Sequence, residues 1–114
     1  MASNTNELHL TPEAQADLLA IKTYISKDLE NPVAALPTLK RITQTIRLLR
    51  GQALIGTPLS AIADLRNDEG YRYLTSGSYM IVYRAAGRDV YIDRILYGGR
   101  DYLRALGLEP SPET

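Results

Sequence analysis

Six arginines between positions 72 and 104 are the residues whose type and spacing most strongly indicate chemistry. Their guanidinium groups can pair with phosphates or carboxylates, and six of the eight tyrosines lie between positions 71 and 97. Tyrosine rings beside arginines on an open face are suited to stack on bases while the arginines pair with phosphates. Packing within a sheet is the ordinary alternative for these tyrosines, and both interpretations stay open. The arginines are Arg72, Arg84, Arg88, Arg94, Arg100 and Arg104.

Other kinds of chemical site have little support in the residue types. Thirteen basic and thirteen acidic residues give a formal net charge of zero, so a nucleic-acid role needs a local patch. His9 is the only histidine and cysteine is absent, so the usual metal ligands are lacking. The glycines match neither GxGxxG nor GxxxxGK, the spacings of phosphate-binding loops. We therefore predict no metal, no cofactor and no nucleotide site, and we expect His9 at a strand edge near the surface.

Length and composition predict one domain over residues 1–114, with an ordered core at about 7–107 and a flexible tail at 108–114. The first ten residues lack a basic segment followed by an apolar run, and no stretch approaches the roughly 20 apolar residues of a membrane span. The absence of cysteine agrees with a reducing compartment. We therefore expect a cytoplasmic protein without a membrane partner.

The elements that must position the arginines begin with a short strand over residues 7–10 and two helices. Thr11-Pro12 and Asn31-Pro32 each supply a capping residue followed by a proline, which predicts an antiparallel helical hairpin that ends near Gly51. Pro37 predicts a kink or a delayed start in the second helix. The predicted apolar faces consist of Ala14, Leu18, Ile21, Ile25 and Leu29 in the first helix and Leu36, Leu39, Ile42, Ile46 and Leu49 in the second.

Residues 52–67 lack periodicity and predict a long surface connection with room for one short helical turn. Three runs rich in tyrosine and β-branched residues, at 71–75, 79–85 and 90–97, then predict two consecutive hairpins. Strict alternation in the last run predicts that Ile92 and Arg94 share one face, opposite Asp93 and Ile95. A short helical turn is expected over 100–106. The result is an α+β fold, in the order β-α-α-β-β-β, with the helices on one side of an antiparallel sheet.

The segment YRYLTSGSYMIVYRAAGRDVYIDRILYGGRDYLRAL, residues 71–106, resembles the C-terminal half of RelE/ParE superfamily toxins. SYMIVYR, a polar turn and RILYGGRDY are similar to the ParE-type pattern, in which the last strand runs into an Arg-Asp pair. LTPEAQADL, NPVAAL and IGTPL extend the resemblance over roughly residues 7–107. The resemblance implies the toxin of a bacterial type II toxin-antitoxin system, of the plasmid-stabilisation type.

The resemblance implies two mechanisms. RelE-like toxins are ribosome-dependent messenger RNA endoribonucleases, whereas ParE-like toxins inhibit DNA gyrase without a catalytic site of their own. By position, Arg72 and Arg100 match sheet and post-strand cations of the ribonucleases, and Tyr97 stands where the family often has histidine. Met80 replaces another of their arginines, and a thioether cannot hold a phosphate charge. We therefore expect binding to gyrase rather than catalysis, and a ribonuclease would use Arg72, Arg100 and Tyr97.

The residues expected to bind the target are those at the functional end of the sheet, and ordinary surface ion pairing is their alternative role. The resemblance also implies a cognate antitoxin that folds onto the helical hairpin and the open sheet, in a hetero-oligomer with the toxin. A third possibility is a degenerate module that binds the antitoxin without being toxic. The expected target-binding residues are Arg72, Arg84, Arg94, Tyr97, Arg100 and Asp101.

Overall fold

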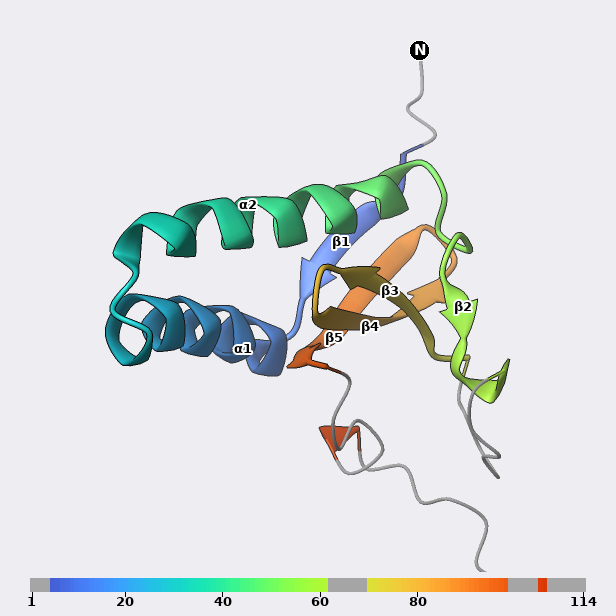
Figure 1. Ribbon diagram of the computed structural model, residues 1–114. Helices are drawn as coiled ribbons and strands as arrows, with labels where there is room; N and C mark the ends of the chain where they lie inside the picture. Colours follow the sequence, from blue (N-terminus) through green and yellow to red (C-terminus); the bar gives the residue numbers. More distant parts are fainter. Residues whose placement is uncertain (1–4, 62–69, 99–104, 107–114) are drawn as a thin grey trace, which may run out of the picture.

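Two helices lie against one face of a five-stranded sheet in the computed structural model of the protein (Figure 1). The structure describes residues 5–61, 70–98 and 105–106. The strand order is β1-β5-β4-β3-β2. The predicted α+β architecture is therefore confirmed. The strands are β1 (Glu7–Leu10), β2 (Thr57–Pro58), β3 (Arg72–Ser76), β4 (Tyr79–Ala86) and β5 (Asp89–Tyr97).

The prediction that all strands are antiparallel is wrong at β1, which pairs with β5 in parallel and makes the sheet mixed. The helical hairpin separates β1 from the other strands in sequence. No tight turn therefore connects β1 to β5, and the two strands are not forced to run antiparallel. The second difference is β2, which pairs antiparallel with β3 inside the predicted surface connection. Two residues are too few to produce an alternating pattern, so this strand has no sequence signature.

The helices begin where the capping residues predict. The Thr11 side chain accepts a hydrogen bond from the Ala14 N–H before α1 (Pro12–Thr23), which continues into a π-helical turn at Tyr24–Asp28. The Asn31 side chain caps α2 (Pro32–Arg47) in the same way. The predicted delay at Pro37 is wrong, because α2 starts at Pro32 and runs through Pro37. The cap and Pro32 fix the first turn, and the helix loses only the hydrogen bond that residue 37 would have donated.

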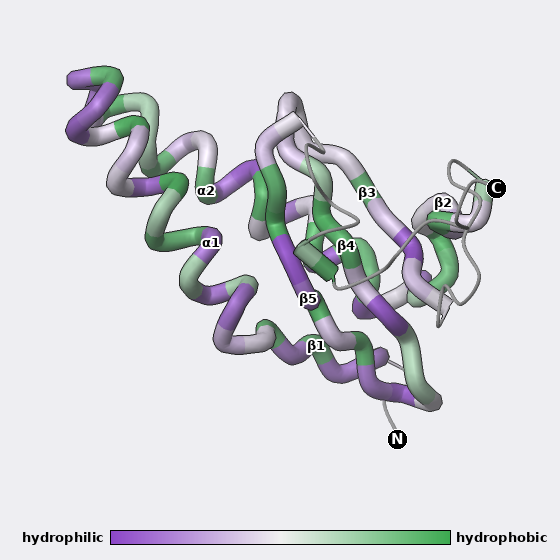
Figure 2. The backbone as a smooth tube through the Cα atoms, turned by 90° about the horizontal axis from the view of Figure 1, so that it is seen from below, coloured by the Kyte–Doolittle hydropathy of each residue, from purple (hydrophilic) through white to green (hydrophobic). Residues whose placement is uncertain are grey.

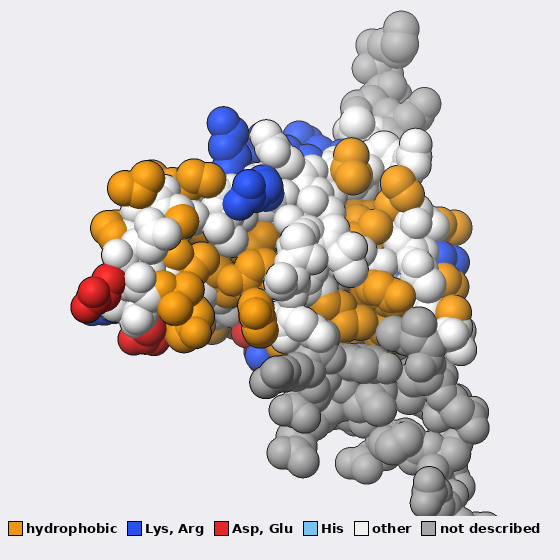
Figure 3. Space-filling model, viewed as in Figure 1, with side chains coloured by type: hydrophobic (Ala, Val, Ile, Leu, Met, Phe, Trp, Pro, Cys, Tyr) orange, Lys and Arg blue, Asp and Glu red, His pale blue; other side chains and the backbone are white. Residues whose placement is uncertain are grey.

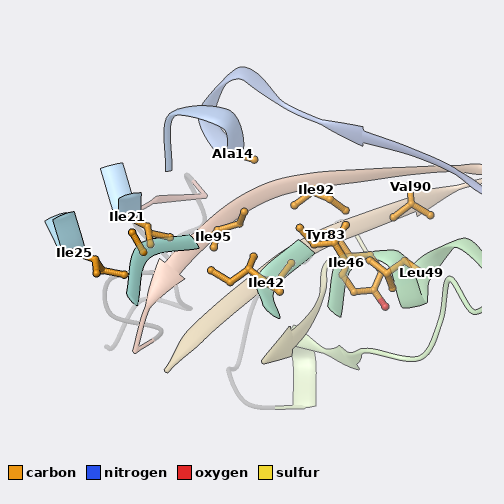
Figure 4. Packing of buried hydrophobic residues seen from close by; sticks show 12 residues of the cluster. Ala14, Ile21, Ile25, Ile42, Ile46, Leu49, Tyr83, Val90, Ile92 and Ile95 are labelled. Atoms are coloured by element: carbon orange, nitrogen blue, oxygen red, sulfur yellow. The ribbon is translucent and has the colours of Figure 1, made fainter. Parts of the chain in front are cut away.

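The main hydrophobic core lies between the helices and the sheet (Figure 4). Ile42 of α2 and Ile81, Tyr83 and Ile92 of the sheet are fully buried. The predicted helical faces are correct in their central parts but not at the tip of the hairpin, where Leu29 and Leu36 are 55% and 69% exposed. The tip extends beyond the sheet, so nothing in the described structure covers these two side chains.

A bulge between β4 and β5 changes which side chains face the core. Val82 pairs with Arg94 and Tyr83 with Ile92, so Asp93 is an extra residue in β5. Ile92 and Ile95 consequently both point into the main core. The predicted division that placed Ile92 with Arg94 and opposite Ile95 is therefore wrong. Figure 2 shows the hydrophilic stretch that interrupts β5 at its centre.

A smaller cluster covers part of the opposite face of the sheet. Leu59, from a 3-10 turn at Leu59–Ala61, packs with Met80 and Val82, and Leu106 contacts the cluster from the C-terminal end. This turn matches the short helical turn predicted between residues 52 and 67. Of the turn predicted over 100–106, only Ala105 and Leu106 are described, and the tail at 108–114 lies outside the described residues. No described helix is long and apolar enough to cross a membrane.

Candidate functional site

A row of stacked side chains crosses the sheet on the face away from the helices. The His9 ring stacks on Tyr91 with their centroids 5.0 Å apart. The guanidinium carbon of Arg84 lies 5.7 Å from the centroid of Tyr91 and 5.6 Å from that of Tyr71. His9 pairs with Tyr91, and Tyr91 with Arg84, in the strand register. The tertiary structure therefore places aromatic rings beside an arginine on this face, which is one of the two interpretations that the sequence left open.

The charges around this row differ from those of a phosphate-binding surface. Arg84 donates to Asp93 through Nε at 2.7 Å and through Nη2 at 3.4 Å, and the Asp93 side chain is only 13% exposed. Glu7 and Asp89 place two more carboxylates beside His9. The Arg84 guanidinium is therefore already paired with a carboxylate, which weakens its attraction for a phosphate.

Arg72 faces the helix side and holds the loop before β2. Its Nη1 donates to the carbonyl of Gly56 at 2.8 Å and to that of Leu54 at 3.3 Å. The Gly56 N–H donates in turn to the buried Tyr83 Oη at 2.8 Å. Burial raises the pKa of Tyr83, and the Gly56 hydrogen bond and the Arg72 charge oppose this shift less strongly. The geometry thus gives Arg72 a structural role.

Arg94 is bound at the edge of β5 that lies beyond the end of β1. Its Nε and Nη2 donate to the two carboxylate oxygens of Asp17 in α1, at 2.7 and 2.9 Å. The Asp17 carboxylate also accepts the Ile95 backbone N–H at 2.9 Å. The hydrogen bond with Asp17 is the main reason why the pKa of Arg94 is raised. Arg94 is therefore held by an ion pair that fixes α1 to the sheet.

Tyr97 lies on the helix side, at the rim of an apolar groove of about 810 Å³. Its ring meets that of Tyr79 edge-on, with centroids 5.6 Å apart. Burial, followed by the proximity of Tyr97 and Tyr24, raises the pKa of Tyr79. Figure 3 shows the hydrophobic side chains that gather over this side of the hairpin. The groove is lined by Asp17, Ala20, Ile21, Tyr24, Ile25, Leu29, Asn31, Ala34, Thr38, Tyr79, Ile95, Leu96 and Tyr97.

The predicted site residues do not form one cluster. Arg84 and Arg94 both start from the face away from the helices, but Arg94 reaches round the edge of β5 to Asp17, and Arg72 and Tyr97 lie on the helix side. Arg72 of β3 pairs with Tyr83 of β4, and Tyr83 pairs with Ile92 of β5. Tyr97 lies five residues beyond Ile92 along β5. At about 3.3 Å per residue, the two are separated by roughly 15 Å along the sheet. Arg100 and Asp101 lie outside the described residues.

Sequence reasoning missed Asp17 and Tyr24. Asp17 had a usable signal, since it shares a helical face with Ala14 and Ile21, and a carboxylate on a core-facing stripe indicates a partner. Tyr24 had none, because its position depends on the π-helical turn that begins there.

Comparisons with known proteins agree with this fold. A family model described as "ParE toxin of type II toxin-antitoxin system, parDE" matches residues 8–102. A solved structure described as "Chromosomal ParDE TA system from P. aeruginosa" contains a similar chain, with a TM-score of 0.66 and 27% sequence identity. That similarity covers 83% of this chain and 98% of the other. No curated protein sequence matches.

Proposed function

Because this chain belongs to the ParE toxin family of type II toxin-antitoxin systems, we propose that it inhibits growth by binding DNA gyrase and that a cognate antitoxin neutralises it. The family model matches residues 8–102, and this match is the basis for assigning the chain to the toxins. The choice of gyrase over messenger RNA is carried by one observation, the separation of Arg72 from Tyr97.

Cleavage of RNA requires a base, a cation and an acid around a single phosphate. The backbones of Arg72 and Tyr97 are separated by roughly 15 Å along the sheet, and their side chains are directed to different partners, the Gly56 carbonyl and the Tyr79 ring, so they do not converge on one phosphate position. The Arg72 guanidinium also donates to the Gly56 carbonyl, and Arg84 and Arg94 are paired with carboxylates. These contacts support inhibition by binding, which needs surface complementarity and no acid-base set.

The antitoxin is proposed to occupy the apolar groove between the helical hairpin and the end of β5. The similar chain from P. aeruginosa belongs to a ParDE system, in which a second protein accompanies the toxin. Ala20, Ile21 and Ala34 contribute apolar side chains to the walls of the groove, together with the rings of Tyr79 and Tyr97. A segment with regularly spaced apolar side chains would bury them here, as amphipathic segments do in hydrophobic grooves.

The deciding experiment measures both activities with the same purified toxin. We expect it to inhibit supercoiling by gyrase and to leave messenger RNA on translating ribosomes intact. Cut messages with unaffected gyrase would overturn the proposal in favour of the ribonuclease. A toxin inactive in both assays, although it binds the antitoxin, would indicate the degenerate module. In cells, induction should stop DNA synthesis before protein synthesis.

A further inference from the structure

We propose that Glu7, His9 and Asp89 form a binding site for a divalent transition-metal ion, with Zn²⁺ as the representative ion. Glu7 and His9 are two residues apart on β1, so they point to the same face, and Asp89 is the β5 partner of Glu7. His9 Nε2 lies 2.9 Å from Asp89 Oδ1. One ligand atom from each of the three residues lies within 4.8 Å of the other two.

These distances suit one ion. At metal–ligand bonds of about 2.0–2.2 Å, two ligands of the same ion are about 3 to 4 Å apart. His9 Nε2 and Asp89 Oδ1, which share a hydrogen bond at 2.9 Å, need to move apart only slightly to reach this separation. Glu7 is exposed, so a change of side-chain rotamer can bring its carboxylate closer without moving the backbone. Three protein ligands leave the remaining coordination positions to water.

The ligand types select the class of ion. One imidazole with two carboxylates suits Zn²⁺ and similar first-row ions, whereas Mg²⁺ and Ca²⁺ prefer sites made of oxygen ligands alone. The His9 ring is oriented by stacking on Tyr91, which limits the entropy that binding costs. Arg50 and Arg88 line a pocket with Glu7 and Asp89, so their positive charge lowers the affinity of the site for a cation.

The site would connect the two strands of the parallel pair. β1 is a four-residue edge strand, and its ligands lie 80 to 82 residues from Asp89 in sequence. An ion bound to both strands would therefore stabilise the folded state, in which alone the three ligands meet. The sequence predicts no metal here, because Asp89 is 80 residues from His9 and comes close to it only through the pairing of β1 with β5.

The test uses the full-length toxin with any affinity tag removed. Since His9 is the only histidine, its ring Hε1 proton gives one unambiguous imidazole signal in NMR spectra. We expect added Zn²⁺ to shift this signal at a one-to-one ratio, to show the same stoichiometry in calorimetry and to raise the melting temperature.

Three variants assign the site. Glu7→Gln and Asp89→Asn should each weaken Zn²⁺ binding at least tenfold, and His9→Gln should abolish the rise in melting temperature. Glu13→Gln, an exposed carboxylate on α1, is the matched control and should bind like the wild type. Binding that survives His9→Gln would overturn the proposal, as would an imidazole signal that millimolar Zn²⁺ leaves unchanged. Circular dichroism shows whether each variant is folded. If one variant does not fold, Zn²⁺ binding by the other two decides whether the site exists.

Discussion

Asp17 in α1 holds Arg94 of β5 through both carboxylate oxygens and accepts the backbone N–H of the next residue, Ile95. β1 ends opposite Ile92, so no strand of the described residues pairs with this part of β5 on that side. The carboxylate therefore accepts a backbone N–H that a neighbouring strand would otherwise accept. It also fixes the distance between α1 and the sheet, and hence one wall of the groove.

Asp17→Asn should reduce the free energy of unfolding by about 2–3 kcal/mol, because Arg94 is left without its charged partner at a site where both side chains are largely buried. Urea denaturation measures the change. Lys22→Gln on the same helix is exposed, so it should change stability by less than about 0.5 kcal/mol. Equal effects of the two substitutions would contradict the role given to the ion pair.

Tyr83→Phe should cost about 1–3 kcal/mol of stability, because the Gly56 N–H loses its buried acceptor. The ring itself stays in the core, so the circular dichroism spectrum should not change. Hydrogen exchange at the Gly56 amide should accelerate in the variant. Unchanged exchange would show that this hydrogen bond does not protect the loop.

The wild type should lose stability in alkaline solution. The pKa of Tyr83 is raised above 10.0 by burial, so the folded state holds its proton more tightly than the unfolded state. The stabilisation is complete below pH 10 and decreases as the pH rises through the folded-state pKa. Unfolding midpoints measured between pH 8 and 11 should fall less steeply in Tyr83→Phe, with Tyr79 responsible for part of the remaining slope.

Gly56→Ala should destabilise the protein by at least about 1–3 kcal/mol. A Cβ at this position would lie 2.6 Å from Tyr83 Oη and 2.7 Å from the Tyr73 carbonyl oxygen, and backbone cannot move aside easily. Gly51→Ala is the matched control, since a Cβ there meets nothing within 4 Å. Thermal unfolding of both variants checks the prediction, and a stable Gly56→Ala protein would refute it.

Ala20→Arg should weaken antitoxin binding at least tenfold, because it places a long charged side chain on the wall of the apolar groove. Ala20 is exposed, so the fold should persist. Calorimetry with the purified antitoxin measures the affinity, and Gln44→Arg, exposed on α2 outside the groove, controls for added charge. If both variants bind like the wild type, the groove is not the antitoxin site.

The elements that local chemistry specifies were predicted well. Thr11 and Asn31, each followed by proline, fixed where both helices begin, and two short polar turns fixed the hairpins among β3, β4 and β5. These signals are readable because the hydrogen-bond partners lie within a few residues of one another. The family pattern in residues 71–106 was recognisable for the same reason, since it follows the chain continuously.

The tertiary structure alone decided which side chains meet. The bulge at Asp93 reversed which side chains of β5 face the core beyond it. The parallel register placed Asp89 beside His9, and the fold paired Asp17 with Arg94, 77 residues away in sequence. No local pattern encodes such pairs, because a shift of one residue in register reverses every side chain of a strand without changing its sequence. The sequence thus specified the elements and the family, while the pairing of strands and helices determined which arginines became structural.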